Sequence, residues 1–431
     1  MAAAHPLMPG PGAARLAGFV GVACCVATAA ALLALPPEIQ PDTASYLGHS
    51  PERAPLYPYF LDLFRALFGE GMAIWVARLQ TASLVAASVF FASRVGRALD
   101  LSLPWRCLLF LMLSLPGLKF AAVLLTEPLG FTLLIVFWAL LAEDVLLGRS
   151  RRVWLCLLCG LGLLLRPQLL FLPVFLGLFL LGRTVCRRDR ASLASLALLA
   201  LVMIGTVALR GADNQMRYDT FSTASSGGIH LLSSLLYISD PADAAAIREP
   251  AARELFLAAF AKAEARQLTR AHWDKSRSHF DVAMEGLVFE VVRPTLGEFV
   301  GPEAGGGSAG QALRQDRLAM SAAVPLLNHM PVRFLGLLAR KAYDGQPFYY
   351  ALVLITGALA LAFSLGTGSR SAQLYALAAL HSCLSYGVIL LAGVYSLRYI
   401  LPAEAILLAL AVAVGGSLLG PLKAQVRGEK V

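Results

Sequence analysis

Long apolar runs recur along this chain and restrict it to a membrane fold. A helix needs about 20 apolar residues to cross the hydrocarbon core of a bilayer. Hydrophobic residues make up 58% of the 431 residues and charged residues only 15%, which is too apolar for soluble domains of this total length. We therefore expect an all-α polytopic membrane protein that crosses the bilayer about ten times. The expected spans are residues 16–35, 72–92, 105–125, 128–147, 153–165, 169–181, 192–209, 348–365, 374–395 and 400–419.

Basic residues occupy every second connector between these spans, as the positive-inside rule requires of cytoplasmic loops. They are Arg94, Arg97 and Arg106; Arg149, Arg151 and Arg152; Arg183, Arg187, Arg188 and Arg190; Arg370; and Lys423, Arg427 and Lys430. Both termini are then cytoplasmic, and the first apolar run is an uncleaved signal anchor. The net charge of +9 is a topology signal in this interpretation, so we expect no nucleic-acid partner.

The same rule divides the chain into three parts. Residues 1–210 form an N-terminal transmembrane half with about seven spans and a first outer loop at 36–71, and residues 347–431 form a C-terminal half with about three spans. Residues 211–346 form an extracytoplasmic segment with expected helices at 251–270 and 314–343, separated by a glycine-rich break at 305–308. Residues 331–341 mix apolar and basic side chains at helical spacing, which is typical of a helix in the headgroup layer. A plain juxtamembrane linker is the alternative.

The first outer loop holds a dense group of polar, aromatic and proline residues at 41–59. Asp42 lies just outside the first span, where its surroundings rather than bulk water can set the proton affinity of a carboxylate. Such a group can act as a general base, and general-base catalysis contributes about a hundredfold to ten-thousandfold. The alternative is a helix N-cap or a turn residue after Pro41, since Asp is common at both positions.

Further charged residues are expected on the same face of the membrane. Glu127 stands directly before a proline at the start of a span, where it lines a site, completes a helix N-terminus near the positive dipole end, or does both. Arg53, Arg166 and Arg398 can each bind a phosphate through two parallel hydrogen bonds, and each can equally extend its charge to the membrane interface. Two acids and three arginines on one face suit the handling of a phosphorylated lipid beside an acceptor.

Five short motifs occur in a fixed order along the chain. They are Asp42 with Tyr46, Arg53-Ala54-Pro55-Leu56-Tyr57-Pro58, Thr126-Glu127-Pro128, Leu165-Arg166-Pro167 and Arg398-Tyr399-Ile400-Leu401-Pro402. This arrangement resembles the GT-C superfamily of glycosyltransferases. Within it, the chain is most similar to the bacterial relatives of dolichyl-phosphate-mannose protein mannosyltransferases and of the lipid A aminoarabinose transferase. The resemblance covers the membrane part and leaves residues 211–346 unmatched.

The resemblance implies a GT-C-like bundle that transfers a sugar from a polyprenyl-phosphate donor to a glycan, lipid or protein acceptor. The site would face the extracytoplasmic side of a bacterial inner membrane. Asp42 would deprotonate the acceptor hydroxyl or bind a divalent cation, and Glu127 would be the second acid and the other metal-ligand candidate. Direct displacement by the acceptor would invert the anomeric centre. The residues implied to bind substrate are Tyr46, Arg53, Tyr57, Arg166, Arg398 and Tyr399, with the arginines stabilising the departing lipid phosphate.

Two departures from the family pattern bear on donor type and metal use. Thr43 follows Asp42 where many relatives have Glu, and Ala403-Glu404-Ala405 follows Pro402 in place of a second proline. The chief alternative function is a lipid-linked sugar flippase or transporter without transferase activity, which would place its ionisable residues near mid-membrane. A third is a scaffold subunit with a degenerate site. Most expected spans have apolar centres, which favours the enzyme.

Overall fold

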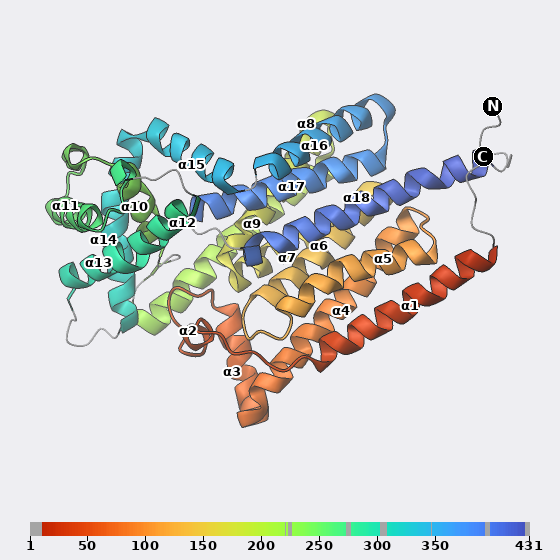
Figure 1. Ribbon diagram of the computed structural model, residues 1–431, viewed down its shortest axis with the longest axis horizontal. Coiled ribbons are helices and arrows are strands. Elements are labelled where there is room, and N and C mark those ends of the chain that lie inside the picture. Colours follow the sequence, from red (N-terminus) through yellow and green to blue (C-terminus); the bar gives the residue numbers. More distant parts are fainter. Residues whose placement is uncertain are drawn as a thin grey trace.

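The computed structural model describes residues 11–219, 221–222, 226–272, 277–301, 308–345, 347–392 and 397–426 (Figure 1). Within these ranges there is no β-strand, and the one strand-like contact is an isolated parallel bridge between Glu38 and Val123. The chain is therefore an all-α protein, as its apolar runs predict.

The helices fall into three groups along the chain. The first group is α1 (Pro11–Ala34), α2 (Thr43–Leu47), α3 (Leu56–Phe68), α4 (Met72–Ala98), α5 (Leu103–Ser114), α6 (Glu127–Leu147), α7 (Arg152–Leu165), α8 (Phe171–Arg187) and α9 (Arg190–Tyr218). The second is α10 (Gly227–Ile238), α11 (Pro250–Ala265), α12 (Arg277–Gly286), α13 (Arg293–Phe299), α14 (Ser308–His329) and α15 (Pro331–Gly345). The third is α16 (Pro347–Thr367), α17 (Arg370–Ala392) and α18 (Leu397–Val426).

Several of these helices are long and apolar enough to cross a membrane. In the described part of the chain there are six such stretches: Arg15–Ala34, Leu56–Ala98, Glu127–Leu147, Pro167–Cys186, Arg190–Tyr218 and Tyr349–Thr367. Each overlaps an expected span, so the chain is a multi-pass membrane protein by length and composition.

One expected span differs from the structure, and a second is formed but short. The span at 105–125 does not form one helix, because α5 ends at Ser114 and is followed by the 3-10 turn η2 (Leu115–Lys119). Pro116 has no backbone N–H, so it cannot continue the α-helical hydrogen bonding at this point. The 14 residues of α7 form a helix, but at 1.5 Å per residue its length is only about 21 Å. This is shorter than the hydrocarbon core, which is about 30 Å thick.

The larger of two hydrophobic cores lies among the long helices, with α6 at its centre. In the apolar stretch of α6, 78% of the residues are buried, against 11% in the first span. α6 packs against α4, α7, α17 and α18, and these neighbours leave little of its surface exposed. The exposed residues of α1, α9 and α16 are mostly apolar, as expected of helix faces that contact lipid.

The second core belongs to α10–α15, which gather at one end of the molecule (Figure 1). α10 and α14 approach each other closely at Gly228, where a Cβ atom would lie 2.4 Å from the Asp316 carbonyl oxygen. The Asp316 carboxylate accepts hydrogen bonds from the backbone N–H groups of Gly228 (2.7 Å) and Ile229 (3.3 Å). It thereby satisfies helix-start donors that have no partner within α10.

The expected helices in this segment have different limits in the structure. The helix expected at 251–270 ends at Ala265, and the one expected at 314–343 is two helices, α14 and α15, bent by 98°. Pro331 at the start of α15 prevents continuous helical hydrogen bonding across this joint. The glycine-rich break lies outside the described residues except for Ser308. On α15, Val332 and Leu335 are 79% and 63% exposed, so the headgroup-layer prediction stays open.

The C-terminal end of α6 carries a buried charge cluster. Glu143 accepts hydrogen bonds from Arg94 (2.7 Å) and Arg151 (2.9 Å), and Asp144 accepts one from Arg183 (2.7 Å). Both acids are only 2% exposed. The sequence predicted these arginines as topology signals alone, but here they also neutralise two buried carboxylates and tie α4 and α8 to α6. The first residues of α1 and the last of α18 lie at the end of the molecule opposite α10–α15 (Figure 1).

Candidate functional site

The segment after α1 brings Asp42 to the start of α6. The Glu38 N–H donates to the Ala122 carbonyl (3.0 Å), and the Leu124 N–H donates to the Glu38 carbonyl (2.9 Å). The Thr43 hydroxyl adds a bond to the Leu124 carbonyl (3.1 Å). Residues some eighty positions apart in the sequence, near 38–43 and 122–127, are therefore held side by side.

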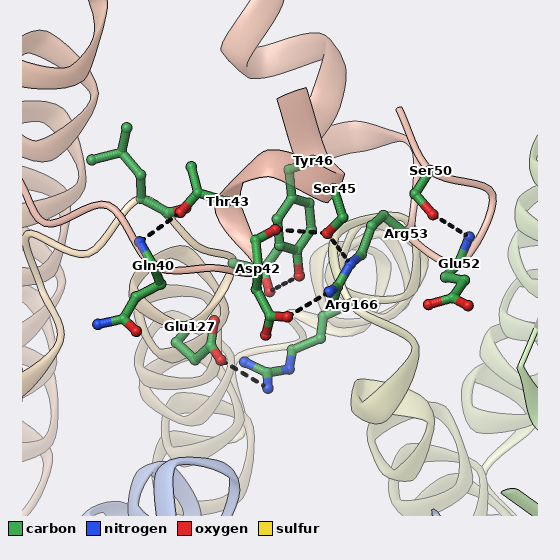
Figure 2. A network of polar contacts seen from close by, with 12 residues as sticks. Gln40, Asp42, Thr43, Ser45, Tyr46, Ser50, Glu52, Arg53, Glu127 and Arg166 are labelled. Carbon is green, nitrogen blue, oxygen red and sulfur yellow. Dashed lines mark hydrogen bonds and ion pairs between the residues drawn. The ribbon is translucent and has the colours of Figure 1, made fainter. Parts of the chain in front are cut away.

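Asp42 directly precedes the short helix α2 but does not cap it. Its side chain makes no capping hydrogen bond to the backbone of α2. Instead, its Oδ1 accepts a hydrogen bond from Arg53 Nη2 at 2.9 Å (Figure 2). The cap alternative is therefore wrong for the carboxylate of Asp42, which points toward a cation and is 40% exposed.

Three groups hold Arg53 in this position. Besides Asp42, the Ser45 hydroxyl accepts from Arg53 Nε at 2.7 Å, and the guanidinium carbon lies 4.6 Å from the centre of the Tyr46 ring. Ser45 in turn donates to the Asp42 carbonyl at 2.6 Å. Burial by itself lowers the pKa of Arg53, but Tyr46 and Asp42 together raise it above its ordinary value. The guanidinium is therefore a fixed positive charge.

Two buried tyrosines connect this loop to the helix bundle. The Tyr46 hydroxyl lies 3.3 Å from the Thr126 hydroxyl, and its ring meets the Tyr57 ring edge-on at 5.1 Å. Tyr57 is fully buried, and its hydroxyl accepts from Gln80 Nε2 at 3.0 Å. Gln80 also donates to the Leu125 carbonyl at 2.9 Å. Tyr57 therefore contacts Tyr46 and Gln80 rather than an open part of the site.

Glu127 and Arg166 form a second acid–arginine pair. Arg166 Nη2 donates to Glu127 Oε1 at 3.3 Å, and the two side chains are 10% and 7% exposed, respectively. Arg166 adopts an extended backbone (φ −157°, ψ 117°) between α7 and the 3-10 turn η3 (Pro167–Leu170), as residues before proline prefer. The alternative in which Arg166 extends to the interface is wrong, because its guanidinium turns inward to a buried carboxylate.

A cavity of about 30 Å³ adjoins this second pair. This volume holds one or two water molecules. Its polar lining residues are Glu127, Arg166, Gln168 and Ser385, and its apolar ones are Gly130, Phe131, Leu134, Leu169, Phe171 and Pro402. Pro402 belongs to the N-terminal part of α18, so the beginning of that helix lies at the site. Arg398 and Tyr399 are in the first turn of α18, and their side chains lie outside the described residues.

The loop that carries Asp42 also contacts α9 and α13. Arg293, the first residue of α13, pairs with Glu52 at 3.0 Å. The hydroxyl of Tyr218, at the end of α9, donates to the His49 carbonyl. These contacts connect the loop to the segment that contains the second core. Glu52 immediately precedes Arg53, so the α13 contact lies one residue from the Asp42–Arg53 pair.

The sequence singled out both acids and both arginines but missed two supporting residues. Ser45 is a common residue type with no distinctive spacing, and only its contact with Arg53 reveals a role. Thr126 was part of the Thr126-Glu127-Pro128 motif, and the structure adds its contact with the Tyr46 hydroxyl. Gln80 had a usable signal, because a polar amide inside an expected span is uncommon. It is fully buried and joins Tyr57 to the backbone that precedes Glu127.

The described side chains do not by themselves complete a metal site. Among the residues that the structure describes, no three His, Cys, Asp or Glu side chains gather in one place. Asp42 and Glu127 each contact an arginine instead. We therefore assign no metal ligand to either acid.

No protein-family model matches this sequence, and searches of curated proteins and of solved structures also give no match. The geometry of the site is thus the basis for a functional conclusion. It offers a half-exposed carboxylate, two guanidinium groups held by acids, and a partly apolar cavity at the N-terminal end of α6.

Proposed function

We propose that this chain is a GT-C-type membrane glycosyltransferase that moves a sugar from a polyprenyl-phosphate donor to an extracytoplasmic acceptor. The observation that carries this proposal is the gathering of two acid–arginine pairs, Asp42 with Arg53 and Glu127 with Arg166, at the N-terminal end of α6 (Figure 2). Guanidinium groups bind phosphate oxygens in a planar, bidentate geometry. Two of them beside an acid suit a reaction that releases a phosphate and takes up a proton.

The mixed lining of the cavity, rather than its volume of about 30 Å³, supports a lipid-linked donor. Polar residues (Glu127, Arg166) and apolar residues (Phe131, Phe171) line the same space between helices of an apolar bundle. A phosphate on a prenyl chain has the matching distribution, with a charged head and a hydrocarbon tail. A water-soluble sugar nucleotide has no apolar tail to place against these residues.

In the proposed reaction, Asp42 acts on the acceptor and the arginines act on the donor. The acceptor oxygen attacks the anomeric carbon of the sugar and transfers its proton to the Asp42 carboxylate. The bond between that carbon and the phosphate oxygen breaks, and the electron pair stays on the phosphate. The leaving lipid phosphate gains one negative charge, which Arg53 and Arg166 stabilise. The anomeric configuration inverts.

The proposed topology has about ten spans and cytoplasmic termini, in a bacterial inner membrane. Two arrangements support termini on the side opposite the site: the first residues of α1 and the last of α18 lie at the end of the molecule opposite α10–α15 (Figure 1), and the acid–arginine pairs lie at the N-terminal end of α6. The segment α10–α15 would then be extracytoplasmic, with α15 at the headgroup layer. Acceptor recognition by this segment is part of the proposal, since α13 contacts the loop that carries Asp42.

Incubation of the purified protein with a panel of polyprenyl-phosphate sugars tests the function. We expect release of the lipid phosphate with at least one donor, and a loss of about 10²- to 10⁴-fold in transfer rate for Asp42→Asn. Glu70→Gln is the matched control, because Glu70 is an exposed acid in the short turn η1 (Gly69–Gly71). A flippase conserves its cargo and would release no lipid phosphate. Full activity of Asp42→Asn would remove Asp42 from the mechanism.

A further inference from the structure

The Asp42–Arg53 contact has a property that the proposed reaction does not use. The candidate base and a candidate phosphate ligand are bonded to each other, at 2.9 Å. In this arrangement Arg53 Nη2 donates to Asp42 Oδ1, and Arg53 Nε donates to Ser45. A phosphate that binds the edge formed by these two nitrogens therefore competes with the Asp42 carboxylate for Arg53.

The surroundings of the pair allow Asp42 to leave while Arg53 stays. Arg53 retains two other contacts, with the Ser45 hydroxyl at 2.7 Å and with the face of the Tyr46 ring at 4.6 Å. Tyr46 is itself buried against Thr126 and Tyr57. The side chain of Asp42 is 40% exposed against 24% for Arg53, so the carboxylate is the more accessible partner.

We propose that the Asp42–Arg53 ion pair is a latch that the phosphate group of the incoming ligand displaces. The phosphate takes Arg53 Nη2 from Asp42 Oδ1, and the carboxylate is released to accept a proton from the acceptor. The base is thereby kept off the acceptor until a donor phosphate is in place. This proposal rests on the proposed function for its catalytic meaning, but the exchange of ligands on Arg53 is a binding event that can be measured by itself.

The second pair supplies a reason why the ligand is drawn to this place. Tyr46 connects the two pairs: its ring lies 4.6 Å from the Arg53 guanidinium carbon, and its hydroxyl lies 3.3 Å from that of Thr126, which directly precedes Glu127 (Figure 2). The Arg166–Glu127 pair borders the partly apolar cavity. A phosphate that exchanges onto Arg53 therefore has a second guanidinium group nearby. A lipid phosphate can also place its chain toward Phe131 and Phe171, whereas inorganic phosphate has no group for these residues.

The test is equilibrium binding of a polyprenyl phosphate without sugar to the full-length protein in lipid nanodiscs at about 0.15 M salt, with inorganic phosphate as a second probe. Asp42→Asn removes a competitor of the phosphate, so we expect binding about three- to fivefold tighter, the range typical of a partly exposed ion pair. Asp42→Ala should act in the same direction. Arg53→Ala should weaken binding about tenfold or more.

Glu52→Gln is the matched control for general electrostatics. It removes the same charge one residue from Arg53, but the Glu52 carboxylate pairs with Arg293. Its effect should be less than half that of Asp42→Asn, and it should fade with added salt. Equal effects of the two variants, or unchanged or weaker binding in Asp42→Asn, would overturn the latch. Tighter binding by both Asp42 variants supports the latch. If only the polyprenyl phosphate binds more tightly, the phosphate comes from a lipid; if inorganic phosphate also binds more tightly, the site accepts a free phosphate as well.

The outcome separates the latch from the transferase. If Asp42→Asn tightens phosphate binding but the wild-type protein transfers no sugar from any donor, the latch stands and the transferase proposal fails. If the wild-type protein transfers sugar but Asp42→Asn leaves phosphate binding unchanged, the transferase stands and the latch fails.

Discussion

Removal of one partner of the Glu127–Arg166 pair should destabilise the protein strongly, and removal of both should not. The two side chains are 10% and 7% exposed for Arg166 and Glu127, and their contact is 3.3 Å. Arg166→Met leaves a buried carboxylate without this cation, which costs about 3 kcal/mol, the lower end of the range for broken buried pairs because the contact is long. Glu127→Gln leaves a buried guanidinium and should cost a similar amount.

The double variant Glu127→Gln/Arg166→Met keeps the volume of both side chains and removes both charges. Replacing a complete buried pair is often close to neutral, so we expect a loss of about 1 kcal/mol or less. The coupling energy between the two sites is then several kcal/mol, which a double-mutant cycle measures directly. Unfolding in mixed detergent, followed by circular dichroism, provides the four free energies.

Lys119→Met is the control, because Lys119 is an exposed cation in η2. It should change the free energy of unfolding by no more than about 0.5 kcal/mol. Additive losses in the double variant would show that Glu127 and Arg166 are independent, and the description of a paired site at the start of α6 would then be refuted.

Two further predictions concern other ion pairs. The hydrogen bond from Arg152 lowers the pKa of Asp189, which lies between α8 and α9, to about 2. Because the pKa of Asp189 is lower in the folded state than in the unfolded state, where it is about 4, the ionised carboxylate stabilises the fold above about pH 4. This stabilisation is lost as the pH falls through about 2. Asp189→Asn should therefore flatten the pH dependence of unfolding between those values; an unchanged profile would contradict it. For the Glu52–Arg293 contact (3.0 Å), reversing either charge alone should speed hydrogen exchange in residues 41–59 by about fivefold or less, as expected for a partly exposed pair. The double reversal Glu52→Arg/Arg293→Glu should restore protection, and failure to do so would mean that the pair does not hold the loop.

Much of the fold follows from local sequence properties. The apolar runs predicted helices that the structure contains, because an apolar stretch inside a bilayer has no water to bond its backbone and a helix satisfies those groups within the stretch itself. Prolines explain two of the differences: Pro116 ends the helix expected at 105–125, and Pro331 divides the one expected at 314–343 into α14 and α15. The number of crossings beyond six stays a prediction.

The candidate site was predicted by residue type but not by pairing. Asp42 and Arg53 are eleven positions apart in one loop, yet nothing in that spacing distinguishes an ion pair from a helix cap. Glu127 is the first residue of α6, and Arg166, 39 positions later, lies between α7 and η3. Their contact depends on how α6 packs beside α7, which local periodicity does not specify.

The sequence alone determined that this chain is helical, apolar and built to lie in a membrane, because hydrophobic runs and prolines act locally. It also singled out Asp42 as the acid of greatest interest. Only the tertiary structure decided what Asp42 contacts. Long-range packing places residues 38–43 beside 122–127 and turns Arg53 toward the carboxylate, since these contacts join segments that no local rule relates.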